Sequence, residues 1–301
     1  MQSFRSVAVL CWFLVASGAV RAQEAVVIKL KARGAGDAII IKKSDSVTIK
    51  LKIEDAKGKV LHDQNETKTV ISEFKETVIQ RPVKKLPTKL ERDYVKMQTT
   101  IADKSEISAL QGKTVVIEKK DGKYTFAFKE GGAISGPALA ALLKDFGKKD
   151  DSSVGLNQLM LPKAAVKPGD IWKLDMNAVF KELIKGDGDM DVDSAKGVGT
   201  GKLLKSYQNA GRQFGEMQFM FEAPLKSMGK EAQQMRFNAG AKMAMNMVLN
   251  TCIDGSTEEG SIRITTNLGG TASLASLPGS VVTLSVAGVI QGTQEEPVKK
   301  K

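Results

Sequence analysis

Residues 161–175 read Leu-Pro-Lys-Ala-Ala-Val-Lys-Pro-Gly-Asp-Ile-Trp-Lys-Leu-Asp. Within them, Pro168-Gly169-Asp170 is a turn signal, because proline presets φ and glycine accepts a positive φ. The next four residues, Ile171 to Leu174, predict the start of a strand. We interpret this stretch as the point where one lobe of antiparallel sheet passes into another, so that the rest of the chain is organised on either side of it.

Alternation of apolar and polar side chains predicts β-strands on both sides of this stretch. Before it, strands are expected at 26–33, 38–43, 47–54, 66–81, 94–101, 114–119 and 123–129. After it, strands are expected at 201–207, 212–222, 235–251, 261–274 and 281–291. Asp121-Gly122 is a type I′ hairpin signal, and Asn209-Ala210-Gly211 and Asp254-Gly255 mark further turns.

Two short helices are expected between these strands. Ser135-Gly136-Pro137 opens the first, since serine caps helices well and proline is tolerated in the first turn. Its apolar stripe ends at Phe146. The second is expected to run from its cap, Asn177, to Lys185. Both helices are expected to cover a face of the sheet or to fill the end of a barrel.

The predicted fold is therefore mainly β: a large curved antiparallel sheet, arranged as a half-barrel or a two-lobed sandwich, with two short helices. The predicted organisation is a signal peptide at 1–22, an N-terminal β lobe at 23–150 with its helix near 137–146, a C-terminal β lobe at 151–292, and a disordered polar tail at 293–301.

The N-terminal residues predict export. Arg5 precedes an apolar run at 7–20, and small side chains at Val20 and Ala22 follow at the positions that a signal peptidase reads. The run is shorter than the ~20 residues that a membrane-spanning helix needs. Cys11 lacks the small residues of a lipid-attachment site before it. We expect a periplasmic or extracellular protein with no transmembrane span in the mature chain.

The charge is strongly basic, with a formal net value of +11 over 301 residues. Most lysines alternate with apolar residues in the predicted strands, which places them on solvent faces and edges. This charge gives a weak attraction for an anionic envelope surface. Aromatic residues make up only 5% of the chain, which leaves few platforms for base stacking, and nucleic acid is not an expected partner.

Several motifs for catalysis or ligand binding fail on spacing. The glycine-rich stretch 197–202 has neither the glycine spacing of a phosphate loop nor Ser or Thr after Lys202. The alternating aspartates from Asp187 to Asp193 lack the glycine and glutamate of a calcium loop, which leaves a solvated acidic loop or a weak calcium site. The match of residues 227–230 to Ser-x-x-Lys has no accompanying Lys-Thr-Gly.

The residue types needed for other chemistries are scarce. Cys252 is the only cysteine after the signal, and we interpret it as a small apolar side chain near a strand end. The single histidine, His62, is expected in a polar loop, and one histidine excludes a multi-histidine metal site. We expect no cofactor, no metal and no enzyme activity. A hydrolase that uses a carboxylate pair stays open, because 34 acidic residues offer many combinations.

A methionine- and phenylalanine-rich face is the candidate site. Alternation along two predicted strands brings together Met217, Phe219, Phe221, Met243, Met245 and Met247. Methionine suits adaptable apolar surfaces, so this face is a candidate lining for an acyl chain. Ordinary core packing of a sandwich or half-barrel gives the same pattern. A Cu(I) thioether site is a third, weaker interpretation.

The pattern Leu161-Pro162, Val166-Lys167, Gly169-Asp170 and Trp172 resembles one found in uncharacterised exported bacterial β-rich proteins. Such chains are similar in fold to the half-barrels of periplasmic lipoprotein carriers, which hold acyl chains in a concave apolar face. The resemblance implies a non-enzymatic binding or carrier module for an apolar or amphiphilic ligand such as a lipid. The alternative is a structural or interaction protein of the cell envelope that uses its basic sheet faces.

Overall fold

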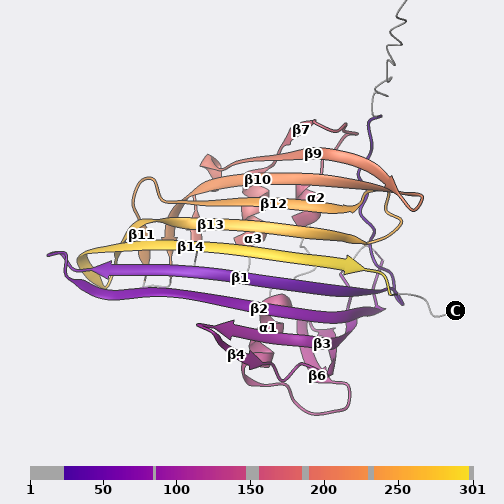
Figure 1. Cartoon of the computed structure of the whole chain (residues 1–301), viewed down its shortest axis with the longest axis horizontal. Coiled ribbons are helices and arrows are strands. Elements are labelled where there is room, and N and C mark those ends of the chain that lie inside the picture. Colours follow the sequence, from indigo (N-terminus) through magenta and orange to yellow (C-terminus); the bar gives the residue numbers. More distant parts are fainter. Residues whose placement is uncertain (1–23, 84–85, 147–155, 185–189, 230–233, 298–301) are drawn as a thin grey trace, which may run out of the picture.

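The computed structural model describes residues 24–83, 86–146, 156–184, 190–229 and 234–297 (Figure 1). The predicted signal peptide lies outside these residues, as do residues 187–189 of the predicted acidic loop and the boundary predicted near residue 150. Residues 190–192 of that loop form a short strand. The protein is mainly β, and its fourteen described strands form one antiparallel sheet. Of the arrangements left open by the sequence, a single large curved sheet is the one found.

The strands follow the chain in two groups. The first group is β1 Ala38–Glu54, β2 Val60–Gln80, β3 Lys89–Ile101, β4 Lys104–Ile107, β5 Thr114–Lys120 and β6 Lys123–Phe128. The second group is β7 Ile171–Lys173, β8 Met190–Val192, β9 Val198–Asn209, β10 Arg212–Met228, β11 Met235–Phe237, β12 Lys242–Cys252, β13 Gly260–Leu274 and β14 Leu277–Glu295. The helices are α1 Gly136–Phe146, α2 Leu156–Met160 and α3 Met176–Ile184, with a 3-10 turn at Ser194–Lys196.

The two groups of strands meet where β1 pairs with β14. From one end to the other the sheet runs β6, β5, β3, β2, β1, β14, β13, β12, β10, β9, β7, and the short strands β4, β8 and β11 pair beside it. The strands of both predicted lobes therefore belong to one sheet. Two of the predicted hairpin turns form, since Asp121-Gly122 and Ala210-Gly211 both have positive φ at each central residue. The third, Asp254-Gly255, lies instead in the longer connection between β12 and β13.

Both helical groups lie on the same face of the sheet, which we call the helix-bearing face; the other is the open face. Figure 1 shows α1 behind β2 and β3, and α2 and α3 behind the upper strands. Two hydrophobic cores result. The α1 core joins Leu142 and Phe146 to residues of β2, β3 and β5, and the α3 core joins Val179 and Phe180 to residues of β9, β10 and β12.

The N-terminal residues 25–33 form a strap and not the predicted strand. Their only ladder contacts are single bridges, from Val26 to Val166 and from Lys29 to Asp254. Figure 1 shows the strap, in indigo, crossing the ends of the long strands. Residues 26–33 alternate because Ile28 is buried against the α3 core while its neighbours face solvent, and burial alone gives that pattern.

Other boundaries differ from the predictions for identifiable reasons. The predicted strands 38–43 and 47–54 are one strand, because Ser44-Asp45-Ser46 pairs with β2 and β14 without a turn. The predicted strand 235–251 is two, with a turn that includes Gly240 at φ +93°. The predicted tail begins too early at 293, since Thr293 to Glu295 still pair with β1.

The helices also differ in number and in capping. A third helix, α2, was not predicted, because its five residues are too few to show a helical period. Helix α3 begins at Met176, so Asn177 is not its cap. Asp175 takes that role, and its Oδ1 accepts a hydrogen bond from the Ala178 amide at 3.1 Å.

Candidate functional site

The six residues of the predicted methionine and phenylalanine face do lie together on the helix-bearing face. Strands β10 and β12 pair directly, with Phe219 opposite Met247 and Phe221 opposite Met245. Five of the six side chains are at most 5% exposed, and Met245 is half-buried. These five form packed core; whether any of the six contacts a ligand stays a prediction.

Helix α3 and the end of the sheet cover this face, and α1 does not. The Phe180 ring of α3 meets Phe221 edge-on, with 5.9 Å between ring centroids. Trp172 meets Phe219 edge-on at 6.0 Å. Such aromatic pairs add about 0.5–1.5 kcal/mol beyond their area burial. The face that bears Phe219 is therefore filled by side chains from α3 and β7.

The pattern that organises the sequence has a structural role at this place. Gly169 has φ +94°, and Asp170 Oδ2 accepts a hydrogen bond from the Lys167 amide at 2.8 Å, so the predicted turn forms. The turn leads into β7, which pairs with β9 at one end of the sheet. Trp172 Nε1 donates to the Met160 carbonyl at 2.8 Å, which ties β7 to α2.

The glycine-rich stretch 197–202 lies largely in β9. A Cβ at Gly201 would overlap the Trp172 ring, and one at Gly199 would overlap the Met176 sulfur. The glycines thus allow β7 and α3 to approach the sheet closely. Glycine inside a predicted strand is the sequence signal that indicates such an approach.

A band of aliphatic side chains lies between the two cores on the helix-bearing face. Strands β12, β13, β14 and β1 contribute it, and each member is only half-buried; we call Leu249, Ile262, Ile264, Val286, Ile49 and Leu51 the aliphatic band. The strand register sets several of them side by side, with Leu249 opposite Ile262 and Val286 opposite Ile49. The aliphatic band therefore runs obliquely across the sheet, because Ile262 lies opposite Gly292 while Val286 lies opposite Leu268, and each of its side chains keeps part of its surface accessible.

A small hollow continues this band beneath the strap. It has a volume of about 140 Å³, and its lining includes Leu30 and Lys31 of the strap together with Leu249 and Ile262 of the band. The Lys31 ammonium lies 3.0 Å from Glu296 Oε1, and this hydrogen bond raises the pKa of Lys31. The aliphatic band thus ends beside the ion pair of Lys31 and Glu296.

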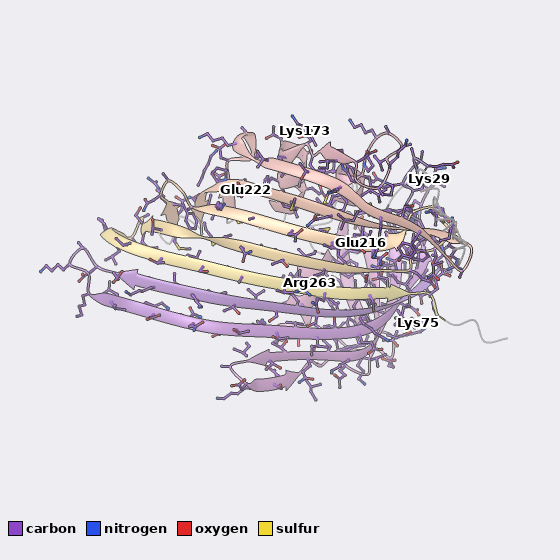
Figure 2. The ribbon with its side chains drawn as sticks, turned by 45° about the horizontal axis from the view of Figure 1, so that its top comes forward. Lys29, Lys75, Lys173, Glu216, Glu222 and Arg263 are labelled. Carbon is purple, nitrogen blue, oxygen red and sulfur yellow. The ribbon has the colours of Figure 1, made fainter. Side chains whose placement is uncertain are left out.

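The open face carries a polar hollow of about 630 Å³, which we call the polar groove. Its lining comes from β3, β2, β1, β14, β13, β12 and β10, so the groove runs across the strands. Figure 2 labels two of its residues, Glu216 and Arg263. The other charged side chains that line it from the open face are Lys42, Glu73 and Lys96.

A buried charge network closes the end of the α1 core. Arg92 lies between the rings of Phe74 and Phe146, at 4.3 and 4.5 Å from their centroids. Its Nε donates to Glu76 Oε2 at 2.6 Å, and its Nη1 donates to Asp145 of α1 at 2.8 Å. The guanidinium thereby links β2, β3 and α1.

The strap joins the same network through Arg33. Its Nη1 lies 2.6 Å from Glu76 Oε1, and its Nε lies 2.9 Å from Glu258 Oε2. These are ion-pair distances, but the alignment does not make Nη1 or the Glu258 oxygen a hydrogen-bond partner. Arg33 is therefore held mainly by the electrostatic attraction of the two carboxylates, and less by well-aligned hydrogen bonds.

The carboxylates of the network have opposite pKa shifts. Burial alone would raise the pKa of Glu76, but the attraction of Arg92 and Arg33 outweighs it, so the pKa is lowered. Burial raises the pKa of Glu258, and the attraction of Arg33 and Lys31 only partly offsets this. Glu76 is thus the fixed anion of the network and Glu258 the one that protonates first.

The single cysteine and the single histidine among the described residues lie in strands of the sheet. Cys252 is 1% exposed, and its thiol lies 3.0 Å from Asp254 Oδ1. Hydrogen bonds from Cys252 and Ser256 lower the pKa of Asp254. His62 lies in β2 and not in the predicted loop.

Among the described residues, no group of three His, Cys, Asp or Glu could hold a metal ion. None of the described helices is long and apolar enough to cross a bilayer.

Comparison with known proteins gives only remote likenesses. No protein-family model matches the chain, and no curated protein matches it. A structure described as "lipid-protein interactions in lipovitellin" aligns at 9% identity and a TM-score of 0.35; the match covers 89% of this chain and about a quarter, 26%, of that one. A Rh. blastica porin mutant aligns at 7% identity and a TM-score of 0.22, over 85% of this chain and 100% of the porin. The COG4313 outer membrane channel of Pseudomonas putida F1 aligns at 7% identity and 0.19, over 89% and 98%.

Proposed function

We propose that this protein binds a long-chain amphiphile along the aliphatic band of its helix-bearing face, as a carrier or storage module without a catalytic step. The observation that carries the proposal is the half-buried state of the band, beside two cores whose side chains are closed off. A patch of neighbouring apolar side chains that stay accessible on a folded protein commonly marks a ligand-binding or interaction site. The proposed setting is outside the cytoplasm, as the N-terminal residues predict.

The dimensions of the band suit one acyl chain. It crosses four strands about 4.8 Å apart, and Val286 lies six residues along β14 from Gly292, the partner of Ile262, so the band runs obliquely over about 25 Å from Leu249 to Ile49. The tail would lie on Leu249, Ile262 and Val286, and the polar head would reach the hollow beneath the strap. Lys31 lines that hollow and supplies a positive charge for a head group, beside its partner Glu296.

A fluorescent fatty acid titrated into delipidated protein tests this proposal. We expect saturable binding to the wild-type protein. Val286→Asp places a charge in the band and is expected to weaken binding about tenfold or more, because burial of an unpaired carboxylate is costly. Ser285→Asp is the matched control: the neighbouring residue is exposed on the open face, so binding is expected to be unchanged.

The proposal fails if the wild-type protein shows no saturable binding, or if the two aspartate variants bind the fatty acid equally well. Thermal unfolding of both variants shows whether each has kept its fold. A Val286→Thr variant, which is close in shape and carries no charge, replaces Val286→Asp if the latter does not fold.

A further inference from the structure

The polar groove has a regular composition across the sheet. One row of side chains follows the register from β3 to β10: Lys96, Glu73, Lys42, Thr293, Ser261, Asn250 and Glu216. Charged groups stand at both ends of this row, and its centre offers only hydroxyl and amide groups. Six strand spacings of about 4.8 Å make the groove about 30 Å long. The site is therefore long and shallow.

Positive charge is in excess within the groove. Arg263 lies in its central part, on β13 beside Gln291 of β14 (Figure 2). Among the described residues, Arg263, Lys42 and Lys96 make no ion pair within 4 Å. Glu216, by contrast, is neutralised by Lys205 at 2.7 Å. An unpaired guanidinium among hydroxyl and amide groups is suited to a carboxylate, which it binds through two parallel hydrogen bonds.

We propose that the polar groove binds an acidic polysaccharide chain whose sugar units carry carboxylates. The length of the groove fits an extended oligomer. Its central hydroxyl and amide groups match sugar hydroxyls, and Arg263, Lys42 and Lys96 match the carboxylates. This site lies on the opposite face of the sheet from the aliphatic band and does not depend on amphiphile binding.

Other polymeric anions fit the groove less well. The groove lies on a sheet face and not at an edge, so it offers no backbone ladder to an extended acidic peptide. Its lining contains no aromatic ring, so it has no stacking platform for single-stranded nucleic acid. Its few apolar lining residues, such as Ile71 and Val248, do not form a pocket for an acyl chain.

Labelled oligogalacturonate titrated into the full protein tests the proposal. Arg263→Gln is expected to weaken binding about tenfold or more, because a hydrogen bond between charged groups contributes about 1.5–3 kcal/mol. Lys50→Gln is the matched control. Lys50 is exposed on the open face of β1 but lies outside the groove, and its loss is expected to change affinity less than about twofold through screened charge alone.

Three results would overturn the proposal: no binding of oligogalacturonate, equal loss in Arg263→Gln and Lys50→Gln, or tighter binding of poly-glutamate than of oligogalacturonate. The second result would mean a general attraction by net charge, and the third an acidic peptide site. Neutral dextran is expected not to bind. Arg263→Gln is expected to bind the fluorescent fatty acid as the wild type does, so failure here is distinguishable from failure of the proposed amphiphile site.

Discussion

The two faces of the sheet differ although the same strands build them. Along β10, Phe219 is buried under Trp172, while its neighbour Gln218 points to the open face and donates to Asn246 at 3.0 Å. Along β2, Glu76 is buried in the charge network, while Lys75 is exposed (Figure 2). The difference teaches that adjacent residues of one strand can be used as matched probes of two surfaces.

The largest expected effect comes from the α3 core. Phe219→Ala removes a ring that is 1% exposed and is expected to lower the free energy of unfolding by about 3–5 kcal/mol. Gln218→Ala, one residue away on the open face, is expected to change it by less than about 0.5 kcal/mol. Urea unfolding followed by tryptophan fluorescence measures both. Equal losses would contradict the assignment of these residues to different faces.

A comparable effect is expected in the α1 core. Glu76→Gln leaves the Arg92 and Arg33 guanidinium groups without their shared anion, and we expect a loss of about 3–5 kcal/mol at neutral pH. Lys75→Gln is the control and is expected to be nearly neutral. Chemical unfolding measures the free energy of unfolding of both variants. A loss below about 1 kcal/mol for Glu76→Gln would mean that the charge network does not stabilise the fold.

The pH dependence follows from the lowered pKa of Glu76. Its stabilising contribution is present above the unfolded pKa of about 4.3 and is lost as the pH falls through the folded value. The difference between wild type and Glu76→Gln is therefore expected to shrink below about pH 4. Unfolding measured from pH 3 to pH 7 checks this, and a constant difference over that range would contradict it.

Glu258 is expected to behave in the opposite sense. Its raised pKa means that its contribution is present below the unfolded value of about 4.3 and is lost as the pH rises through the folded value. Glu258→Gln is therefore expected not to destabilise the protein at neutral pH, and its difference in stability from wild type is expected to shrink as the pH falls and Glu258 becomes protonated. A large neutral-pH loss would show that the pair with Arg33 dominates over burial.

A smaller effect is expected where β9 approaches β7. Gly201→Ala pushes a methyl group into the Trp172 ring, and overpacking of this kind costs about 1–3 kcal/mol. Thr200→Ala, its neighbour on the open face, is expected to cost less than about 0.5 kcal/mol. A shift of the tryptophan emission in Gly201→Ala alone would confirm the contact with Trp172. Unchanged stability would show that close packing against Trp172 is not what requires glycine at position 201.

The smallest effect in this series is expected at the start of α3. Asp175→Ala removes the oxygen that accepts from the Ala178 amide, and loss of such a cap costs about 1 kcal/mol. Asn177→Ala, at the position that the sequence had suggested as the cap, is expected to cost less. Thermal unfolding of the two variants ranks them directly.

Alternation made most of the sheet predictable from the sequence. It identified the long strands and both longer helices, because those segments bury one face and expose the other. It failed for the strap, where Ile28 is buried without a strand partner. It also gave two strands for β1, because a run of Ser, Asp and Ser looks like a turn when its two neighbouring strands are unknown.

The charge network and the groove show the other limit of the sequence. Glu76 shares a face with Phe74 and Val78, and a charged residue in an inward-facing series is a signal that could have indicated a buried pair. Its partners lie far away in the chain, at Arg33 and Arg92. The groove likewise depends on the register of seven strands, which no local pattern specifies. The six candidate residues therefore share the helix-bearing face with the proposed amphiphile site, while the aliphatic band on that face was not identified from the sequence.

Paramagnetic broadening of methionine methyl signals by a nitroxide-labelled fatty acid tests the division between the faces most directly. Met245 lies half-buried on the helix-bearing face beside the aliphatic band, and Met220 is 48% exposed on the open face. If the amphiphile binds as proposed, the Met245 signal broadens more strongly than the Met220 signal at substoichiometric label, because the two residues are neighbours across β10 and β12 and differ in the face they occupy. Broadening of Met220 with Met245 unaffected would contradict the account.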